Sequence, residues 1–249
     1  MPNKVGMVVG YYPAQIDWVQ LCALHANGLI ILDEYDLPGD WLPGHIVVYR
    51  GGSDKKHVVL NWNPAGYAQY LYAWHRQKGN RFCNDLLWLN EPNVPLESGY
   101  NDPSEAIAHT VNWGLAGVEE LRRLYPGKRL HSPPLSPSPE YGDWRALYTQ
   151  MRPLVEACDV LDVHDYLDCG VDLEYLHSLY PDKPVIVSEC GRPGQGMAEY
   201  GRQLVDYWRH LPGFVEFAAP FIWCAPGDDW RDWRLQGTAA ARVILEAGL

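Results

Sequence analysis

The sequence predicts an α/β protein, a single (β/α)8 TIM barrel with a reduced second helix that spans residues 1–249 as one domain. The length of 249 residues suits one α/β barrel. Eight short apolar runs alternate with segments of helical pattern, which is the order of parallel strands joined by crossover helices. A doubly wound open sheet is the alternative. It is disfavoured because GYYPAQ follows the first strand, where that fold would carry a glycine-rich phosphate-binding fingerprint.

The first half of the chain carries three expected strands with little helix between the second and the third. Strands are expected at Val5–Tyr11, Leu29–Leu32 and His45–Arg50, with a helix at Ile16–His25 between the first two. Only DLPGDWLPG separates the second strand from the third, so the second crossover helix should be reduced to a turn. The β-like run His57–Trp62 is interpreted as part of the loop that follows the third strand.

In the second half of the chain, the expected strands and helices alternate regularly. A capping box with proline at the first helical position, Asp102–Glu105, starts a helix whose apolar stripe runs to Leu121. The fourth strand lies in DLLWLNEPN (85–93), and the later strands are expected at Arg129–His131, Val160–His164, Val185–Ser188 and Phe217–Trp223. The other helices are expected at Ala65–Gln77, Trp144–Ala157, Val171–Leu179, Ala198–His210 and Thr238–Ala247.

Charge and hydropathy limit the partners and the location. The formal net charge is −11 and no basic run occurs, which disfavours nucleic acid and anionic membranes as partners. The apolar run in MPNKVGMVVGYYP is too short for a signal peptide, and no later run approaches the ~18 apolar residues of a membrane span. We expect a soluble monomer, cytoplasmic or released by a non-classical route, and an earlier removed leader stays an open alternative.

The cysteines are expected to be free, buried thiols. The six of them form no CxxC motif, which disfavours a zinc knuckle or a thioredoxin-type site. Strands seven and eight are neighbours in a barrel, so Cys190 and Cys224 should lie side by side, close enough for a disulfide to be geometrically possible.

Tryptophan and tyrosine are unusually frequent, with 11 Trp and 16 Tyr against 4 Phe. A flat apolar face with a polar handle suits stacking on sugars, although a large barrel also buries aromatic side chains. The tryptophans in or beside loops at the expected mouth of the barrel are Trp41, Trp62, Trp144, Trp230 and Trp233.

Two apolar strands end in an ionisable glutamate. The fourth strand must stop at Asn90-Glu91-Pro92, because proline cannot donate to a sheet ladder. KPVIVSECG (183–191) repeats the arrangement with Glu189. The C-terminal ends of barrel strands meet at one mouth, where barrels have their active sites. A lone glutamate there would favour a loop salt bridge, but a pair fits glycoside hydrolysis, in which one carboxyl protonates the leaving oxygen and the other attacks.

WLNEPN and VIVSECG resemble the strand-four and strand-seven motifs of the clan-A glycoside hydrolases, the "4/7" retaining barrels. The resemblance covers the architecture of the whole chain, but in sequence only these motifs and a few strand ends. It implies that Glu91 is the acid/base and Glu189 the nucleophile of a retaining glycoside hydrolase, which needs no metal or cofactor. The substrate would be a β-linked poly- or oligosaccharide, and the two carboxyl groups should lie roughly 5–5.5 Å apart.

The resemblance also implies roles for residues near the pair. Asn90 would hydrogen-bond the sugar 2-hydroxyl, a contact that strengthens in the transition state. In the strand-six sequence VHDY, Tyr166 would hold and tune Glu189, and His164 would line the site.

Three further candidates lie at other strand ends. Trp223 resembles the platform under the sugar at the cleavage point. Members of the clan carry a strand-end arginine near the nucleophile, often on the second strand, and Arg50 on the expected third strand is the candidate here. His131 is either a site residue or a histidine of the barrel mouth without a catalytic role.

Several interpretations stay open. A non-catalytic carbohydrate-binding barrel would keep the aromatic residues but has no reason to keep both glutamates, and a transglycosylase would share every residue named. A metal-dependent barrel hydrolase is disfavoured because the first strand ends in Tyr-Tyr rather than His-x-His. Short loops after the second and fifth strands indicate an open cleft and endo action. Plant β-glycans, chitin-like chains and bacterial wall glycan are all candidate substrates.

Overall fold

The structure is a computed structural model, and it describes residues 4–9, 23–32, 46–51, 56–77, 83–191, 196–223 and 232–249. Its strands are apolar runs such as GLIIL and VIVSECG that are buried along their whole length, as expected for parallel strands covered on both faces. They are β1 (Gly6–Val9), β2 (Gly28–Leu32), β3 (Ile46–Arg50), β4 (Asp85–Leu87), β5 (Arg129–Leu130), β6 (Leu161–Tyr166), β7 (Val185–Gly191) and β8 (Val215–Pro220).

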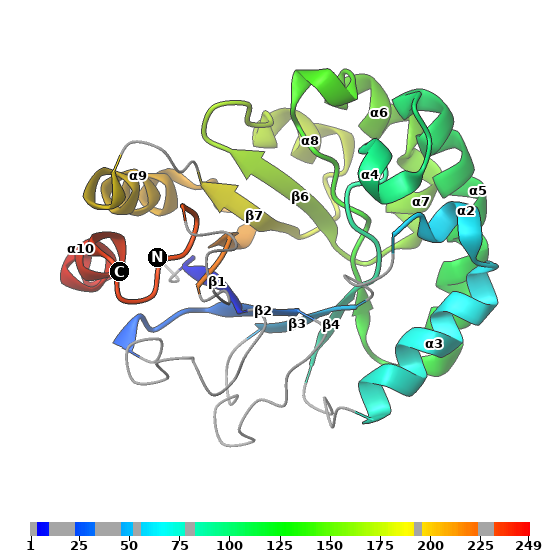
Figure 1. The fold of residues 1–249 in the computed structure, drawn as a ribbon, viewed down its shortest axis with the longest axis horizontal. Coiled ribbons are helices and arrows are strands. Elements are labelled where there is room, and N and C mark those ends of the chain that lie inside the picture. The colour runs from blue at the N-terminus through cyan, green and yellow to red at the C-terminus, as the bar shows by residue number, and fades with distance from the viewer. Residues whose placement is uncertain are drawn as a thin grey trace.

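The strands form a ring in chain order. Hydrogen bonding divides them into two parallel sheets, β1-β2-β3-β4-β5 and β6-β7-β8. Isolated parallel bridges, Val5 with Ala218 and His131 with Val160, join the edges of the two sheets. Figure 1 shows the strands at the centre with the helices around them. The predicted (β/α)8 fold is therefore confirmed, although the reduced second helix falls within residues 33–45, outside the described part of the chain.

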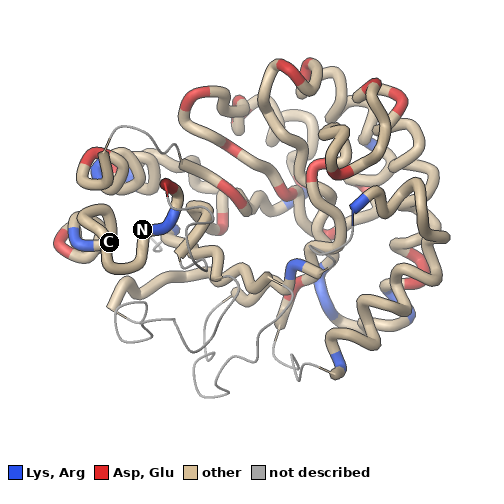
Figure 2. Tube along the Cα trace, in the orientation of Figure 1, with Lys and Arg blue, Asp and Glu red and all other residues tan. Residues whose placement is uncertain are grey.

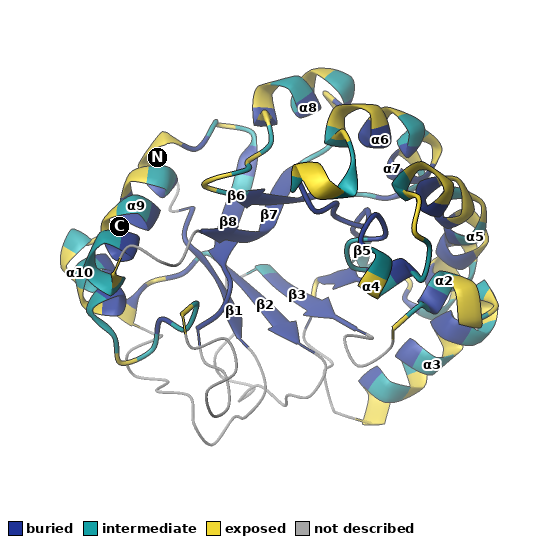
Figure 3. Cartoon of the chain, turned by 45° about the horizontal axis from the view of Figure 1, so that its top comes forward, coloured by how far each residue is buried: buried dark blue, intermediate teal, exposed yellow. Residues whose placement is uncertain are grey.

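The helices pack outside the strands and turn their exposed faces away from them, as Figure 3 shows. None of the described helices has the length and hydropathy needed to cross a membrane. The helices are α2 (Val58–Asn61), α3 (Pro64–Gln77), α4 (Pro95–Ser98), α5 (Pro103–Leu124), α6 (Trp144–Gln150), α7 (Arg152–Ala157), α8 (Leu173–Leu179), α9 (Met197–His210) and α10 (Ala239–Ala247), with a 3-10 turn at Pro139–Tyr141.

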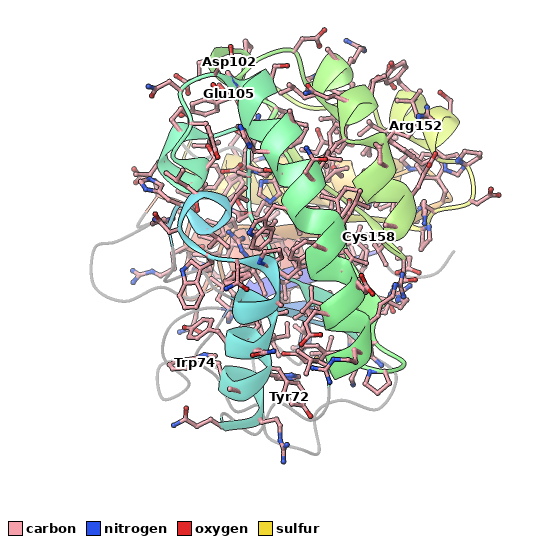
Figure 4. All side chains as sticks on the ribbon, turned by 90° about the vertical axis from the view of Figure 1, so that its right-hand side faces the viewer. Tyr72, Trp74, Asp102, Glu105, Arg152 and Cys158 are labelled. Atoms are coloured by element: carbon pink, nitrogen blue, oxygen red, sulfur yellow. The ribbon has the colours of Figure 1, made fainter. Side chains whose placement is uncertain are left out.

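The predicted capping box begins α5. The Asp102 side chain accepts a hydrogen bond of 2.8 Å from the backbone N–H of Glu105, and Pro103 occupies the first turn. Figure 4 labels Asp102 and Glu105, which lie at the same end of this helix. The cap satisfies one of the backbone donors that a helix start leaves free.

Two expected elements differ in the structure. The run at 57–62 is the short helix α2 rather than β-like loop, because a run this short has no periodicity that separates strand from helix. The helix expected at 144–157 is divided at Met151 into α6 and α7. Pro153 lies in the first turn of α7, where it lacks the N–H that would continue the hydrogen bonding of α6.

The structure describes only one of the two cysteines that were expected to be neighbours. Cys190 lies on β7 and is fully buried, as expected for a core thiol. Cys224 lies outside the described residues, so the neighbouring placement of the two stays a prediction.

A phenylalanine ring fills one end of the barrel interior. Phe217 on β8 is fully buried with side chains of neighbouring strands such as Val8 and Ile30. A Cβ added at Gly6 would lie 2.3 Å from this ring, and one at Gly28 would lie 2.4 Å from it. Glycine at these two positions is what allows the ring to fit, because real Cβ atoms do not approach so closely.

A buried charge cluster links β4, β5 and β6. His131 is fully buried, with Nδ1 2.6 Å from an Asp162 oxygen and Nε2 3.0 Å from an Asp85 oxygen. Arg129 bonds Asp85 at 2.9 Å and Glu216 at 2.8 Å. Burial by itself lowers the pKa of His131, but the bonds to the two aspartates outweigh burial and raise that pKa to about 9. His131 therefore carries a proton at neutral pH.

We expect His131→Leu to lower the free energy of unfolding by about 3–5 kcal/mol, because Asp162 would stay buried without this cation and Asp85 would keep only Arg129. His109→Leu is the control, since that half-exposed histidine pairs with Glu105 on the surface of α5. Urea titrations measure the free energy of unfolding of the two variants and of the wild type.

The stabilisation by His131 also depends on pH. Because the pKa of His131 is raised in the folded protein, the stabilisation is complete below the ordinary histidine pKa and is lost as the pH rises through about 9. Equal unfolding free energies for His131→Leu and wild type would contradict the assignment.

Candidate active site

A pocket with a volume of about 210 Å³ opens where the central strands end. Acidic residues lie along β6 and β7 in the middle of the molecule, as Figure 2 shows. Six of the residues singled out from the sequence line the pocket, the sixth being Trp233, and the ring of Phe221 also forms part of its wall. These lining residues are Arg50, Asn90, Glu91, Tyr166, Glu189, Phe221 and Trp233.

Glu91 follows β4 in an unusual backbone conformation. Its φ is 35°, in the left-handed region that residues other than glycine rarely adopt and that is often found at functional sites. Its side chain is 16% exposed, and its Oε1 lies 2.8 Å from Nδ1 of His164. The carboxyl group is thus fixed at one oxygen while it faces the pocket.

Glu189 lies on β7 and is nearly enclosed by groups that favour its ionised form. Arg50 from β3 forms an ion pair with Oε1, and the Tyr166 hydroxyl donates to Oε2 at 2.7 Å. Burial by itself raises the pKa of Glu189, but the charges of His164 and Arg50 and the two hydrogen bonds outweigh burial and lower that pKa below its usual range. Glu189 is an anion at neutral pH.

The Tyr166 hydroxyl lies between the two glutamates. It is 2.7 Å from Oε2 of Glu189 and 3.4 Å from Oε1 of Glu91. The two carboxylate oxygens can therefore be no farther apart than the sum of these two distances. The hydroxyl has one proton, and the shorter contact, to the buried anion, is the better hydrogen bond.

His164 from β6 also faces both carboxylates. It is fully buried, with Nδ1 against Glu91 and Nε2 3.8 Å from Oε1 of Glu189. Burial by itself lowers the pKa of His164, but the charge of Glu189 and the contact with Glu91 outweigh burial and raise that pKa. The charge interaction is mutual, since a proton on His164 favours the ionised form of Glu189 and lowers the pKa of that carboxyl group.

Asn90 precedes Glu91 and lines the same pocket. Its Oδ1 is buried and has no hydrogen-bond donor among the described residues. A buried acceptor without a hydrogen-bond donor costs free energy. A hydroxyl group of a ligand in the pocket could donate that hydrogen bond.

Three of the expected site residues do not line the pocket: His164, which contacts the two glutamates but is fully buried, and two residues with other surroundings, His131 and Trp223. His131 belongs to the buried charge cluster with Asp85 and Asp162, so it has a structural partner on each ring nitrogen. Trp223 is fully buried in the layer of side chains that packs against the helices. β8 ends at Pro220, before the expected strand end, and the backbone N–H of Trp223 bonds the carbonyl of Val8 on β1 at 2.8 Å.

Aromatic residues other than Trp223 form the wall. Trp233, one of the loop tryptophans noted in the sequence, lies edge-on to the Tyr166 ring at a centroid distance of 5.8 Å and to Phe221 at 6.3 Å. Phe221 had no distinguishing sequence signal beyond its position near a strand end. Trp62 and Trp144 instead pack between helices, against Tyr70 and Tyr175 respectively.

No group of three or more His, Cys, Asp or Glu side chains in the described ranges has the arrangement of a metal site. No protein-family model matches the sequence, and no curated protein matches it significantly. The structure, in contrast, resembles many solved structures.

The similar structures include glycoside hydrolases of two kinds. A GH128 subgroup I endo-β-1,3-glucanase from Amycolatopsis mediterranei, solved with laminaritriose, has a TM-score of 0.60 at 16% identity over 98% of this chain and 99% of that chain. A GH128 subgroup III curdlan-specific exo-β-1,3-glucanase from Blastomyces gilchristii, solved with glucose, has a TM-score of 0.60 at 17% identity over 98% and 99%.

Bacteroides uniformis β-glucuronidase 2 is the second kind, with a TM-score of 0.64 at 14% identity over 89% of this chain. The match spans only 31% of that longer enzyme. At such identities the likeness establishes the fold and not the activity. In fold, this chain is a (β/α)8 barrel like those of known glycoside hydrolases.

Proposed function

We propose that this protein is a retaining glycoside hydrolase that cleaves a β-linked glucan by double displacement. The observation that carries the proposal is the Tyr166 hydroxyl between Glu91 and Glu189, at 3.4 Å and 2.7 Å. These contacts bring one oxygen of each carboxyl group to within the sum of the two distances, which supports the ~5–5.5 Å separation of retaining pairs over the ~6.5–9.5 Å of inverting pairs.

In the first step, an oxygen of Glu189 attacks the anomeric carbon while the bond from that carbon to the glycosidic oxygen breaks. Glu91 gives its proton to the departing oxygen, and a covalent glycosyl-enzyme forms. In the second step, Glu91, now a carboxylate, takes a proton from water. That water attacks the anomeric carbon and displaces Glu189, so the sugar is released with its original configuration.

The groups around the pair suit these roles. Glu189 must be ionised to attack. Arg50 binds its Oε1 and the Tyr166 hydroxyl donates to its Oε2, and both contacts favour the ionised form. The unpartnered Oδ1 of Asn90 could accept a hydrogen bond from a sugar hydroxyl. Phe221 and Trp233 offer apolar surfaces suited to the C–H faces of a sugar ring.

The substrate proposal rests on the fold neighbours. Two of them are β-1,3-glucanases, one endo-acting and one exo-acting, which makes β-1,3-glucan the first substrate to test. Endo action is proposed from the short loops expected at the mouth of the barrel. A transglycosylase would use the same residues with a sugar hydroxyl in place of water.

The first experiment follows the anomeric configuration of the product. We expect proton NMR of a laminari-oligosaccharide digest to show the β-anomer first, with the α-anomer appearing only by mutarotation, because two inversions at the same carbon retain configuration. An α-anomer as the first product would contradict the retaining mechanism. Binding of the same oligosaccharides without any cleavage would favour the carbohydrate-binding barrel.

A further inference from the structure

The pocket extends beyond the two catalytic glutamates toward the short helices α2 and α4. Lys56, Val59 and Glu97 line this extension, and they share the pocket with Glu91 and Glu189. None of the three is needed for the chemistry proposed above. The extension is therefore available for a part of the substrate other than the bond that is cleaved.

An ion pair lies on the wall of this extension. Nζ of Lys56 contacts Oε1 of Glu97, with the side chains 46% and 18% exposed. An ion pair this exposed contributes at most about 1 kcal/mol to folding, so stability alone gives little reason for it. Its position in the pocket suggests a role in binding instead.

Backbone hydrogen bonds tie the pair to the catalytic loop. The N–H of Val94, just before α4, bonds the carbonyl of Glu91 at 2.9 Å, and α4 then presents Glu97. The N–H of His57, next to Lys56, bonds the carbonyl of Glu97 at 2.7 Å. The charged pair is thus positioned relative to Glu91 by main-chain contacts.

The charge balance of the described lining favours a neutral ligand. Lys56 is paired with Glu97, and Arg50 is paired with Glu189. These are the only lysine and arginine among the described residues that line the pocket, so an anionic sugar would find no unpaired cation on them. A lysine and a carboxylate side by side still offer N–H donors and lone pairs, which match the paired hydroxyls of a neutral sugar.

We propose that Lys56 and Glu97 bind the hydroxyl groups of a neutral sugar unit next to the one that is cleaved, with Val59 against its apolar side. This proposal rests on the proposed function and deepens it. It makes the substrate a neutral oligosaccharide of at least two units, and it disfavours a glycan that carries a carboxylate on that unit.

The test compares a long substrate with a short one. Glu97→Gln and Lys56→Met should each lower the ratio of kcat/KM for laminaritriose to kcat/KM for an aryl β-glucoside by about ten- to a hundred-fold, since each removes a hydrogen bond to a charged group. The aryl glucoside carries no second sugar, so it cannot use the pair. Glu156→Gln is the matched control, because it removes a carboxylate from the exposed pair with Arg152 on α7.

Calorimetric binding of laminaritriose to Glu189→Ala, with and without Glu97→Gln, separates this proposal from the proposed function. Weaker binding with Glu97→Gln supports the sugar site even if the wild type cleaves nothing, an outcome that would refute only the hydrolase. Unchanged ratios and unchanged binding refute the site and leave the hydrolase intact. Preferential cleavage of an oligosaccharide with a uronic acid beside the cleaved unit also refutes the neutral-sugar site.

Discussion

Replacing Glu189 by alanine should lower kcat on every glycoside by on the order of 10⁵-fold, because no nucleophile remains to form the glycosyl-enzyme. The loss should be large for good and poor leaving groups alike, because the glycosyl-enzyme cannot form with either. Initial rates with laminari-oligosaccharides and with aryl β-glucosides measure it. Near wild-type activity in this variant would refute the assignment of Glu189.

Glu91→Ala should behave differently, and the contrast identifies the two roles. Natural sugars should react about 10²–10⁴-fold more slowly, because their alkoxide leaving groups need a proton. An activated aryl leaving group needs little protonation, so formation of the glycosyl-enzyme should partly recover. Added azide, which needs no general base, should then release a glycosyl azide of retained configuration. Absence of any azide effect on this variant would argue against Glu91 as the acid/base.

Arg50→Met should shift the acidic limb of the kcat/KM pH profile to higher pH by about 1–3 units. The sign follows from the buried ion pair. Arg50 and His164 lower the pKa of Glu189, and the reaction needs Glu189 as an anion, so activity is lost as the pH falls through that pKa. Without the guanidinium the pKa rises, and the loss begins at a higher pH. Glu189 would also lose a buried partner, so lower stability should accompany the shift.

Arg50→Lys keeps the charge and provides the control. Its acidic limb should lie between those of the wild type and Arg50→Met, because an ammonium group restores the attraction but not the geometry of the guanidinium. Full pH profiles of the three proteins, recorded with one aryl glycoside, give the comparison. An acidic limb that stays in place in Arg50→Met would mean that the ion pair does not set the ionisation of Glu189.

The candidate site could be found from the sequence where its signals are local. Glu91 and Glu189 each end a buried apolar run, and a proline or a nearby glycine limits how far the strand continues. Alternation of strand and helix then required both glutamates to lie at the same mouth, since parallel strands all end there. Tyr166 and Arg50 followed in the same way as strand-end residues. The Asp102 cap of α5 is equally local, and its bond from the N–H of Glu105 is confirmed.

Only the tertiary structure decided which polar residues share partners and which aromatic residues face the pocket. His131 ends its strand as a site residue would, yet Asp85 and Asp162 from neighbouring strands enclose it. Trp223 and Trp233 are both tryptophans expected near the mouth of the barrel, yet Trp223 is fully buried and Trp233 lines the pocket. Lys56 and Glu97 are far apart in the sequence, and contacts between α2 and α4 bring them together. Side-chain partnerships depend on distances between distant segments, which strand and helix periodicity does not encode.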